Sequence, residues 1–396
     1  MSAELTRPLL RLKPGFARRL KGGHPWAYSN EIDIKPEHRA WPPGGFVRLE
    51  GDDGTKFGTF SFNPHSLIAA RRFDRSPAAV IDEKWLLARL EAALALRTRL
   101  FATPFYRLVH AEADGLPGCI VDRYGDALAV QANIAAIERL TEPLVAALRS
   151  LLAPRVIVAR NDSPVRKLEG LEEGRGFLWG SEASAEVEEG GLVFPVDLLT
   201  GQKTGWFFDQ RPNRDAVAKL AAGARVLDVF AHTGAFGLRC AASGAGRVHL
   251  IDSSLAALER AEEAMKRNGL AGVSLERADA FEAMERFGRR GERFDIVICD
   301  PPAFAPTRKD RGPALRAYSK MTRLAAELVS PGGFLFVASC SYHISGADFA
   351  AAVATGLNRA EREGRIVQSG GAGPDHPVHP HLPESAYLKT QWIQLF

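Results

Sequence analysis

Residues 226–237 (VLDVFAHTGAFG) constrain the fold more than any other part of this chain. An apolar run leads into a polar loop that contains glycine, which is typical of a buried parallel strand followed by a helix. The same plan recurs around residues 251–252 and over residues 294–304 (FDIVICDPPAF). These three segments carry acidic residues at or near their strand ends, namely Asp228, Asp252 and Asp300. Parallel α/β sheets bind ligands beyond the carboxyl ends of their strands, so the three carboxylates predict a ligand site at one edge of such a sheet.

The first loop indicates which kind of ligand the sheet binds. It lacks the Gly-x-Gly-x-x-Gly spacing that places a pyrophosphate on a helix N-terminus. A nucleoside without phosphate groups fits better, and we expect S-adenosylmethionine. Gly234 allows the backbone to approach the ligand closely, and Asp252 can accept hydrogen bonds from both ribose hydroxyls. Asp279 follows a third strand, where its carboxylate can receive the adenine amine.

Acidic residues at strand ends have a second interpretation. Any one of them alone is more often a helix cap or a turn residue than a ligand contact. Three such residues at successive strand ends favour the cofactor. The expected cofactor contacts are Phe208, Arg211, Asp228, Phe230, Ala231, His232, Thr233, Gly234, Asp252, Ser253, Asp279, Ala280 and Asp300.

The segment Asp300-Pro-Pro-Ala-Phe304 predicts contact with a nucleic-acid base. Two prolines fix the backbone and remove two hydrogen-bond donors, which leaves carbonyl oxygens to face a substrate. Asp300 can accept a hydrogen bond from an amino or ring N–H group, and Phe304 offers a face on which a base can stack. The alternative is a rigid turn between strand and loop, without a ligand.

Residues 334–341 (FLFVASCS) form another buried strand, which ends at Cys340. Without context, a cysteine is more often a small buried hydrophobe than a nucleophile. Cys340 falls, however, at the carboxyl end of the strand expected beside the Asp300 strand. A thiol has a pKa of about 8.5, so the site must favour the thiolate for it to act as a nucleophile near pH 7. We expect Cys119, Cys240 and Cys299 to be inert, the last because its side chain points to the opposite face from Asp300.

Composition and charge narrow the class of protein. The four cysteines form no Cys-x-x-Cys pair, which favours reduced thiols in a cytoplasmic protein. No apolar run approaches the roughly 20 residues that span a bilayer, and the basic N-terminus lacks the apolar core of a secretory signal. Residues 1–75 hold 13 Lys and Arg against 8 Asp and Glu, whereas the remaining chain has 38 against 39. This local excess suits a polyanionic partner, although a solvated basic surface is the alternative.

A chain of 396 residues is long enough for two or three domains. We expect a small β-barrel over residues 1–75, in which strands at 46–50, 57–62 and 67–71 are separated by turn residues. A helix over 82–100 and an α+β domain follow, up to residue 190, with a further helix near 136–152. From residue 191 to 396, strand and helix patterns alternate as in a doubly wound parallel sheet.

Two further patterns do not predict sites. The segment Gly201-Gln-Lys-Thr-Gly205 lacks the Gly-x-x-x-x-Gly-Lys-[Ser/Thr] spacing of a triphosphate-binding loop. His376, His379 and His381 lie in a proline-rich loop without a cysteine or acidic partner at metal-binding spacing, so we expect no metal there.

Together these residues resemble the family of ribosomal large-subunit RNA cytosine-5 methyltransferases, the RlmI-like group, over nearly the full length. The segments that carry the resemblance are residues 23–30 (GHPWAYSN), 112–118 (EADGLPG), 121–125 (VDRYG), 201–205 (GQKTG), 209–211 (DQR), 300–304 (DPPAF) and 375–377 (DHP). The resemblance implies an N-terminal PUA domain, a small central α+β domain and a C-terminal class I methyltransferase domain of the Rossmann-like type. It also implies large-subunit ribosomal RNA as partner and Cys340 as nucleophile.

One departure from the wider group of 5-methylcytosine RNA methyltransferases concerns product release. Many of them carry a second cysteine after the proline of the Asp300 motif, and this chain has Pro302 there. The base that removes the carbon-5 proton is therefore unassigned. We expect RNA contacts at Arg18, Arg19, Lys21, His24, Trp26 and Phe304.

Two alternative functions stay open at this stage. A related group with a similar Asp-Pro-Pro-x-Phe segment methylates guanine, in which case Cys340 is merely buried. A ribosome-assembly factor that binds RNA without catalysis is the second alternative. The sequence also leaves open whether the chain forms a homodimer.

Overall fold

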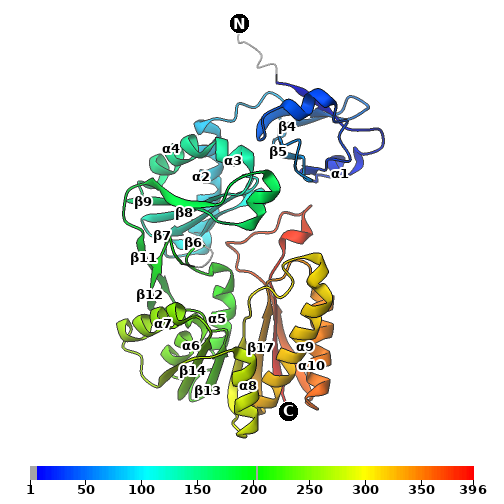
Figure 1. Cartoon of the computed structure of the whole chain (residues 1–396). Coiled ribbons are helices and arrows are strands. Elements are labelled where there is room, and N and C mark those ends of the chain that lie inside the picture. The colour runs from blue at the N-terminus through cyan, green and yellow to red at the C-terminus, as the bar shows by residue number, and fades with distance from the viewer. Residues whose placement is uncertain (1–6, 202–203) are drawn as a thin grey trace. The chain divides into compact units, whose positions relative to one another are not determined.

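The structure, a computed structural model, describes residues 7–201 and 204–396 (Figure 1). The chain divides into two compact units, and the chain passes between them several times. The first unit comprises Met1–Val187, Val196–Phe208 and Pro374–Ser385, and the second comprises Glu188–Pro195, Asp209–Gly373 and Ala386–Phe396. Two residues of the segment 201–205, Gln202 and Lys203, lie outside the described residues.

The N-terminal part of the first unit is a five-stranded sheet. Its strands, in the order β1-β3-β4-β5-β2, are β1 (Leu9–Arg11), β3 (Gly45–Glu50), β4 (Lys56–Phe62), β5 (Ala70–Asp74) and β2 (Trp26–Ala27). A short helix, α1 (Arg18–Lys21), follows β1. The strand expected from Leu67 begins only at Ala70, because backbone and side-chain bonds from Asn63 close a turn over His65 and Ser66. Leu67 is 70% exposed as a result.

The second part of this unit packs helices against another five-stranded sheet. Its strands, in the order β10-β9-β8-β7-β6, are β10 (Gly174–Trp179), β9 (Val156–Asn161), β8 (Ala127–Ala132), β7 (Cys119–Tyr124) and β6 (Phe105–His110). The helices are α2 (Glu83–Leu100), α3 (Ala135–Arg139) and α4 (Thr141–Leu152). The single helix expected near 136–152 is broken at Leu140. Pro143 explains the break, because it has no N–H to bond Arg139 and is tolerated only in the first turn of a new helix.

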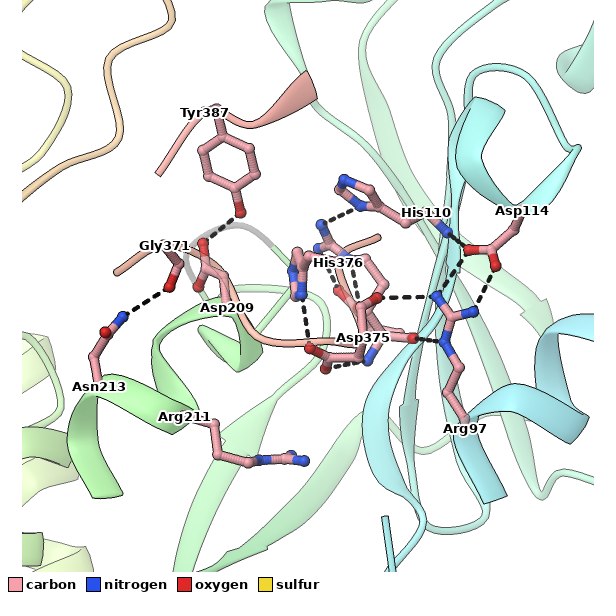
Figure 2. A network of polar contacts seen from close by, with 12 residues as sticks. Arg97, His110, Asp114, Asp209, Arg211, Asn213, Gly371, Asp375, His376 and Tyr387 are labelled. Atoms are coloured by element: carbon pink, nitrogen blue, oxygen red, sulfur yellow. Dashed lines mark hydrogen bonds and ion pairs between the residues drawn. The ribbon is translucent and has the colours of Figure 1, made fainter. Parts of the chain in front are cut away.

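Residues 374–385 are fixed within the first unit by a buried polar network (Figure 2). Arg97 on α2 forms a two-point ion pair with Asp114, and its Nη2 also donates to the carbonyl oxygen of Asp375 at 2.9 Å. The carboxylate of Asp375 accepts from the backbone N–H of Arg107 at 3.1 Å and lies 2.9 Å from Nδ1 of His376. The side chains of Arg97 and Asp114 are 0% and 5% exposed. The imidazole of His376 is therefore paired with a neighbouring carboxylate in a structural network.

The second unit contains a seven-stranded sheet. Its strands, in the order β15-β14-β13-β16-β17-β19-β18, are β15 (Val273–Arg277), β14 (Arg247–Asp252), β13 (Arg225–Val229), β16 (Phe294–Cys299), β17 (Val329–Ser339), β19 (Lys389–Leu395) and β18 (Gly364–Gly370). The first five are parallel, and β19 is antiparallel to both β17 and β18. The carboxyl ends of β13, β14, β16 and β17 consequently meet at one edge.

Helices cover both faces of this sheet (Figure 1). They are α5 (Arg211–Ala218), α6 (Ala235–Ala242), α7 (Leu255–Arg267), α8 (Ala280–Arg289), α9 (Arg311–Leu328) and α10 (Gly346–Arg359). Buried side chains of α8, α9 and α10 share one core with Leu227, Val297 and Leu335 of the strands. On the other face, Phe236 of α6 packs against Phe336 of β17, with ring centroids 5.1 Å apart. Among the described residues, no helix combines the length and apolar character needed to cross a bilayer.

The first prediction concerns the Arg97 network. Arg97→Met should lower the free energy of unfolding by about 3–5 kcal/mol, because it leaves the carboxylate of Asp114 buried without its counter-ion. Urea denaturation measures this loss. Arg89→Met is the matched control, since its pair with Asp74 is 40% exposed at the arginine and should contribute at most about 1 kcal/mol. Equal losses in the two variants would contradict the role assigned to Arg97.

Candidate active site

The loop after β13 has a strained backbone. Phe230 and His232 have positive φ angles of 62° and 51°, which are uncommon for residues with a side chain. Such conformations cost about 1–3 kcal/mol each and cluster at ligand-binding sites. Gly234 continues the loop with φ 74°, and a Cβ there would lie only 2.8 Å from Cδ1 of Leu250. The loop is thus held in one shape at the edge where the parallel strands end.

Asp228 lies beneath this loop and is almost fully buried, with 1% of its surface exposed. Its Oδ2 accepts a hydrogen bond of 2.9 Å from the backbone N–H of Gly237 in α6. Burial raises the pKa of Asp228 to about 8, and the negative charges of Asp300 and Asp252 act in the same direction. Asp228 therefore connects the strand to the following helix.

Asp252 is the last residue of β14, and its side chain binds the loop that follows β13. Its Oδ2 accepts from the backbone N–H of His232, and its Oδ1 accepts from that of Ser254, both at 2.8 Å. A carboxylate oxygen can accept two hydrogen bonds, so each oxygen keeps capacity for one more donor. This arrangement suits a carboxylate that receives two neighbouring hydroxyl groups.

Asp279 has the geometry of a helix cap. Its Oδ1 accepts from the backbone N–H groups of Phe281 and Glu282 at 2.9 and 3.0 Å, at the N-terminus of α8. In the structure Asp279 is therefore the N-cap residue of α8. The contact expected between Asp279 and a cofactor stays a prediction, as do those of Ser253 and Ala280.

The Asp300 segment leaves β16 beside an aromatic cluster. Phe304 packs against Phe230, Phe281 and Tyr318, with ring centroids 6.3, 6.2 and 4.8 Å away. Its ring is partly buried, so only part of it is exposed for stacking. Pro301 is buried and Pro302 is exposed, as expected of a segment that turns outward from a strand.

Cys340 follows the last residue of β17 and lies close to the Asp300 segment. Its Sγ is 4.0 Å from the carbonyl oxygen of Pro301. The parallel pairing of Cys299 with Val337 brings the two segments to the same edge. Cys340 is only partly buried, whereas the other three cysteines are fully buried and their burial raises the pKa of each thiol.

A buried group of three hydroxyls, which the sequence did not reveal, fixes the backbone on both sides of Cys340. Ser339 Oγ donates to the hydroxyl of Tyr318 at 2.9 Å, and that hydroxyl lies 2.9 Å from Ser341 Oγ. Ser341 Oγ also accepts from the backbone N–H of Ala305 at 3.2 Å, which connects the cysteine segment to the Asp300 segment. The two serines are visible beside Cys340 in the sequence, but nothing there indicates Tyr318.

Lys389, at the start of β19, is a second residue that the sequence analysis missed. Its Nζ donates to the carbonyl oxygens of Ser341 and Tyr387, at 2.7 Å each. Burial lowers the pKa of Lys389 to about 8, while attraction to the Cys340 thiolate acts in the opposite direction. A cationic group thus lies next to the candidate nucleophile.

The arginines of α5 form a buried ion pair that the sequence also did not indicate. Arg214 binds both carboxylate oxygens of Glu189, at 2.5 and 2.7 Å. Burial lowers the pKa of Arg214, but Glu189, with Asp209 and Asp300, outweighs this effect and raises it. Arg211, an expected cofactor contact, lies 3.4 Å from the same carboxylate.

Phe208 belongs to the first unit, where it is 1% exposed and packs against Tyr124. Its expected contact with the cofactor stays a prediction, as do the contacts of Ala231 and Thr233. Both of these lie in the strained loop and are largely buried.

The expected RNA contacts of the N-terminal part already have partners. Arg19 pairs with Glu31 at 2.7 Å and Lys21 with Asp53 at 2.6 Å. The indole N–H of Trp26 donates to Glu112 at 2.8 Å. Surface ion pairs of this kind contribute little free energy and can exchange for phosphate contacts. The roles of these residues, and those of Arg18 and His24, stay predictions.

The second prediction concerns the buried carboxyl of Asp228. Its pKa is about 8 in the folded protein and about 3.9 in the unfolded chain, so the folded state binds the proton more tightly. Wild-type stability should therefore fall as the pH rises from about 4 to 8. Asp228→Asn removes this ionisation and keeps an oxygen for the N–H of Gly237. The melting temperature of the variant relative to wild type should rise across this window by at least about 2–4 °C, the shift that 1 kcal/mol produces in a domain of this size. A difference that does not change with pH would contradict the assignment.

Two parts of the chain match known protein families. Residues 174–366 match the family model of S-adenosylmethionine-dependent methyltransferases, and residues 10–75 match that of PUA-like domains. The chain is 35% identical over 391 residues to Ribosomal RNA large subunit methyltransferase I of Shewanella denitrificans, covering 96% of this chain and 97% of that protein. It is 36% identical over 385 residues to the protein of the same name from Photobacterium profundum, with the same coverage.

Solved structures give the same fold. A Streptococcus mutans protein described as a SAM-dependent methyltransferase is similar with a TM-score of 0.81 and 21% identity, over 98% of this chain and 100% of that one. The structure of SMU.776, complexed with SAH, is similar with a TM-score of 0.84 and 21% identity over the same shares. The expected α/β class with an N-terminal PUA-like domain is confirmed, and so is S-adenosylmethionine as cofactor. The chain belongs to the family of Ribosomal RNA large subunit methyltransferase I.

Proposed function

We propose that this protein methylates carbon 5 of a cytosine in large-subunit ribosomal RNA, through a covalent bond between Cys340 and the base. One observation carries the proposal. The Cys340 sulfur lies 4.0 Å from the carbonyl oxygen of Pro301, the residue directly after Asp300. A base bound at the edge where the parallel strands end would thereby have both a thiol and a carboxylate within reach.

The loop after β13 and the end of β14 would hold the cofactor. S-adenosylmethionine supplies a methyl group on a positively charged sulfur, which an electron-rich carbon can attack. Asp252 would accept from the ribose hydroxyls, since both of its oxygens keep acceptor capacity beside the loop. The positive φ angles of Phe230 and His232 support this role, because strained backbone of this kind clusters at ligand-binding sites.

Cys340 and Asp300 would have different roles in the reaction on the base. Carbon 5 of cytosine is a poor nucleophile until a group adds to carbon 6. The Cys340 thiolate would form the carbon–sulfur bond at carbon 6, and the electron pair of the 5,6 double bond would then attack the methyl group from carbon 5. Asp300 would hold the base edge and favour protonation at ring nitrogen 3. Loss of the carbon-5 proton would restore the double bond and release the thiolate.

The substrate follows from the relatives and from the fold. The curated relatives are named for the large subunit of ribosomal RNA. A base must leave its stack to reach a pocket at a sheet edge, at a cost of a few kcal/mol. Phosphate contacts of the basic N-terminal part would offset this cost. A cytoplasmic location is a further prediction.

The third prediction concerns cofactor binding. Asp252→Ala should weaken binding of S-adenosylhomocysteine about 10- to 100-fold, because hydrogen bonds to a charged group contribute about 1.5–3 kcal/mol. Calorimetry measures the change in Kd. Asp295→Ala is the control, since Asp295 binds the backbone N–H of Arg225 at the opposite end of the strands. An unchanged Kd in folded Asp252→Ala would exclude the proposed ribose contact.

The fourth prediction tests the covalent step. Wild-type protein incubated with S-adenosylmethionine and ribosomal RNA that contains 5-fluorocytidine should form a complex stable to denaturing detergent, because fluorine cannot leave as the proton does. Cys340→Ala should form no complex and should lose methyl transfer to ordinary RNA by at least about 10³-fold. Cys299→Ala should behave as wild type, since Cys299 is a core residue of the neighbouring strand.

Nucleoside analysis of the methylated RNA separates the proposal from its rivals. The proposal requires 5-methylcytidine. Methylated guanosine, together with undiminished transfer by Cys340→Ala, would instead support a guanine methyltransferase. Absence of methyl transfer to any ribosomal RNA, despite cofactor binding, would favour an assembly factor.

A further inference from the structure

Lys389 contacts the residues on both sides of Cys340. It pairs with Ser339 across the β17–β19 ladder, and its Nζ donates to the carbonyl oxygen of Ser341 at 2.7 Å. The second carbonyl that holds Nζ belongs to Tyr387, also at 2.7 Å. The hydroxyl of Tyr387 is itself fixed by Asp209 at 2.5 Å (Figure 2). The ammonium group is therefore held by Ser341, which directly follows Cys340, and by Tyr387, while the backbone of Lys389 lies opposite Ser339.

The charge of Lys389 is not neutralised by an acidic partner. Among the residues that the structure describes, its hydrogen-bond acceptors are the two carbonyl oxygens, and no carboxylate forms an ion pair with it. These two oxygens take two of the three ammonium hydrogens. Burial disfavours the charged form and lowers its pKa, and attraction to a Cys340 thiolate is the opposing effect. An ammonium group that is partly removed from water gains most from an anion placed next to it.

We infer that Lys389 is a positioning residue that stabilises Cys340 as a thiolate, both for its attack on the base and for its departure. The inference rests on the proposed function, since it concerns the nucleophile of that reaction. In the resting ion pair, the thiol proton has passed to solvent and Lys389 keeps its own proton. The sulfur uses its electron pair to bond carbon 6 and recovers that pair when the carbon–sulfur bond breaks. Tyr318, whose hydroxyl contacts Ser339 and Ser341, is another titratable group with an electrostatic interaction with Cys340.

The test measures the reactivity of Cys340 directly. The rate of alkylation by iodoacetamide is followed against pH, because only the thiolate reacts. Lys389→Gln removes the charge and keeps N–H donors for the two carbonyls. Its alkylation at pH 7 should be about tenfold slower than that of wild type, which corresponds to a rise of about one unit in the pKa of Cys340. Lys389→Arg keeps the charge and should stay within about threefold of wild type.

Two controls separate the effect of Lys389 on Cys340 from background alkylation and from a general effect of removing one lysine charge. Cys340→Ser gives the background, which should be low because the other three cysteines are buried. Lys266→Gln removes the same charge from an exposed position on α7 and should not change the alkylation rate. Methyl transfer by Lys389→Gln should recover in part as the pH is raised, which a purely structural role would not produce.

The inference is overturned if Lys389→Gln alkylates at the wild-type rate, with the same midpoint in pH. Should that variant not fold, the wild-type profile decides, since a midpoint at or above the ordinary 8.5 of a thiol would equally overturn it. Failure of the proposed function looks different. In that case Lys389 would still control alkylation of Cys340, while Cys340→Ala would keep full methyl transfer.

Discussion

The parallel pairing of β13, β14, β16 and β17 is the constraint on which the rest of the site depends. Adjacent parallel strands have their carboxyl ends at the same edge, so residues that are far apart in sequence are brought together by register alone. Val229 pairs with Cys299, which in turn pairs with Val337. These two pairings bring the loops that begin after positions 229, 299 and 339 to one place. A few residues of each loop then suffice to place functional side chains at this edge of the sheet.

Burial determines the electrostatics of that edge. Asp228 is fully buried and Lys389 is partly buried, and in each case the charged form becomes less favourable, so the pKa of the acid rises and that of the base falls. Arg214 is buried too, yet it stays charged because Glu189 binds it at two points. The site therefore contains one neutralised pair and two groups whose charge depends on their neighbours. The protonation states of Asp228 and Lys389 therefore respond to a bound ligand or a nearby thiolate.

The sequence was informative where a local pattern determines structure. Apolar runs located the parallel strands, and the position of Cys340 at the end of one strand predicted its approach to the Asp300 segment. The pattern was less informative where contacts cross large distances in the chain. Tyr318 and Lys389 both act on the cysteine segment, but one comes from a helix and the other from the last strand, which runs antiparallel to its neighbour. Nothing in the spacing of these residues signals that pairing.

Burial and position also explain why Cys340, rather than the other three cysteines, suits the proposed role of nucleophile. Cys299 lies one residue before Asp300, yet its side chain belongs to the apolar core and burial raises the pKa of its thiol. Cys340 differs in its surroundings, since it lies beyond its strand, partly exposed and next to an ammonium group. A thiolate is stabilised by water or by a positive charge, and the core offers neither. Position at the strand end thus makes the sulfur accessible, and in the proposed reaction Lys389 of the antiparallel strand β19 would supply the positive charge that stabilises the thiolate.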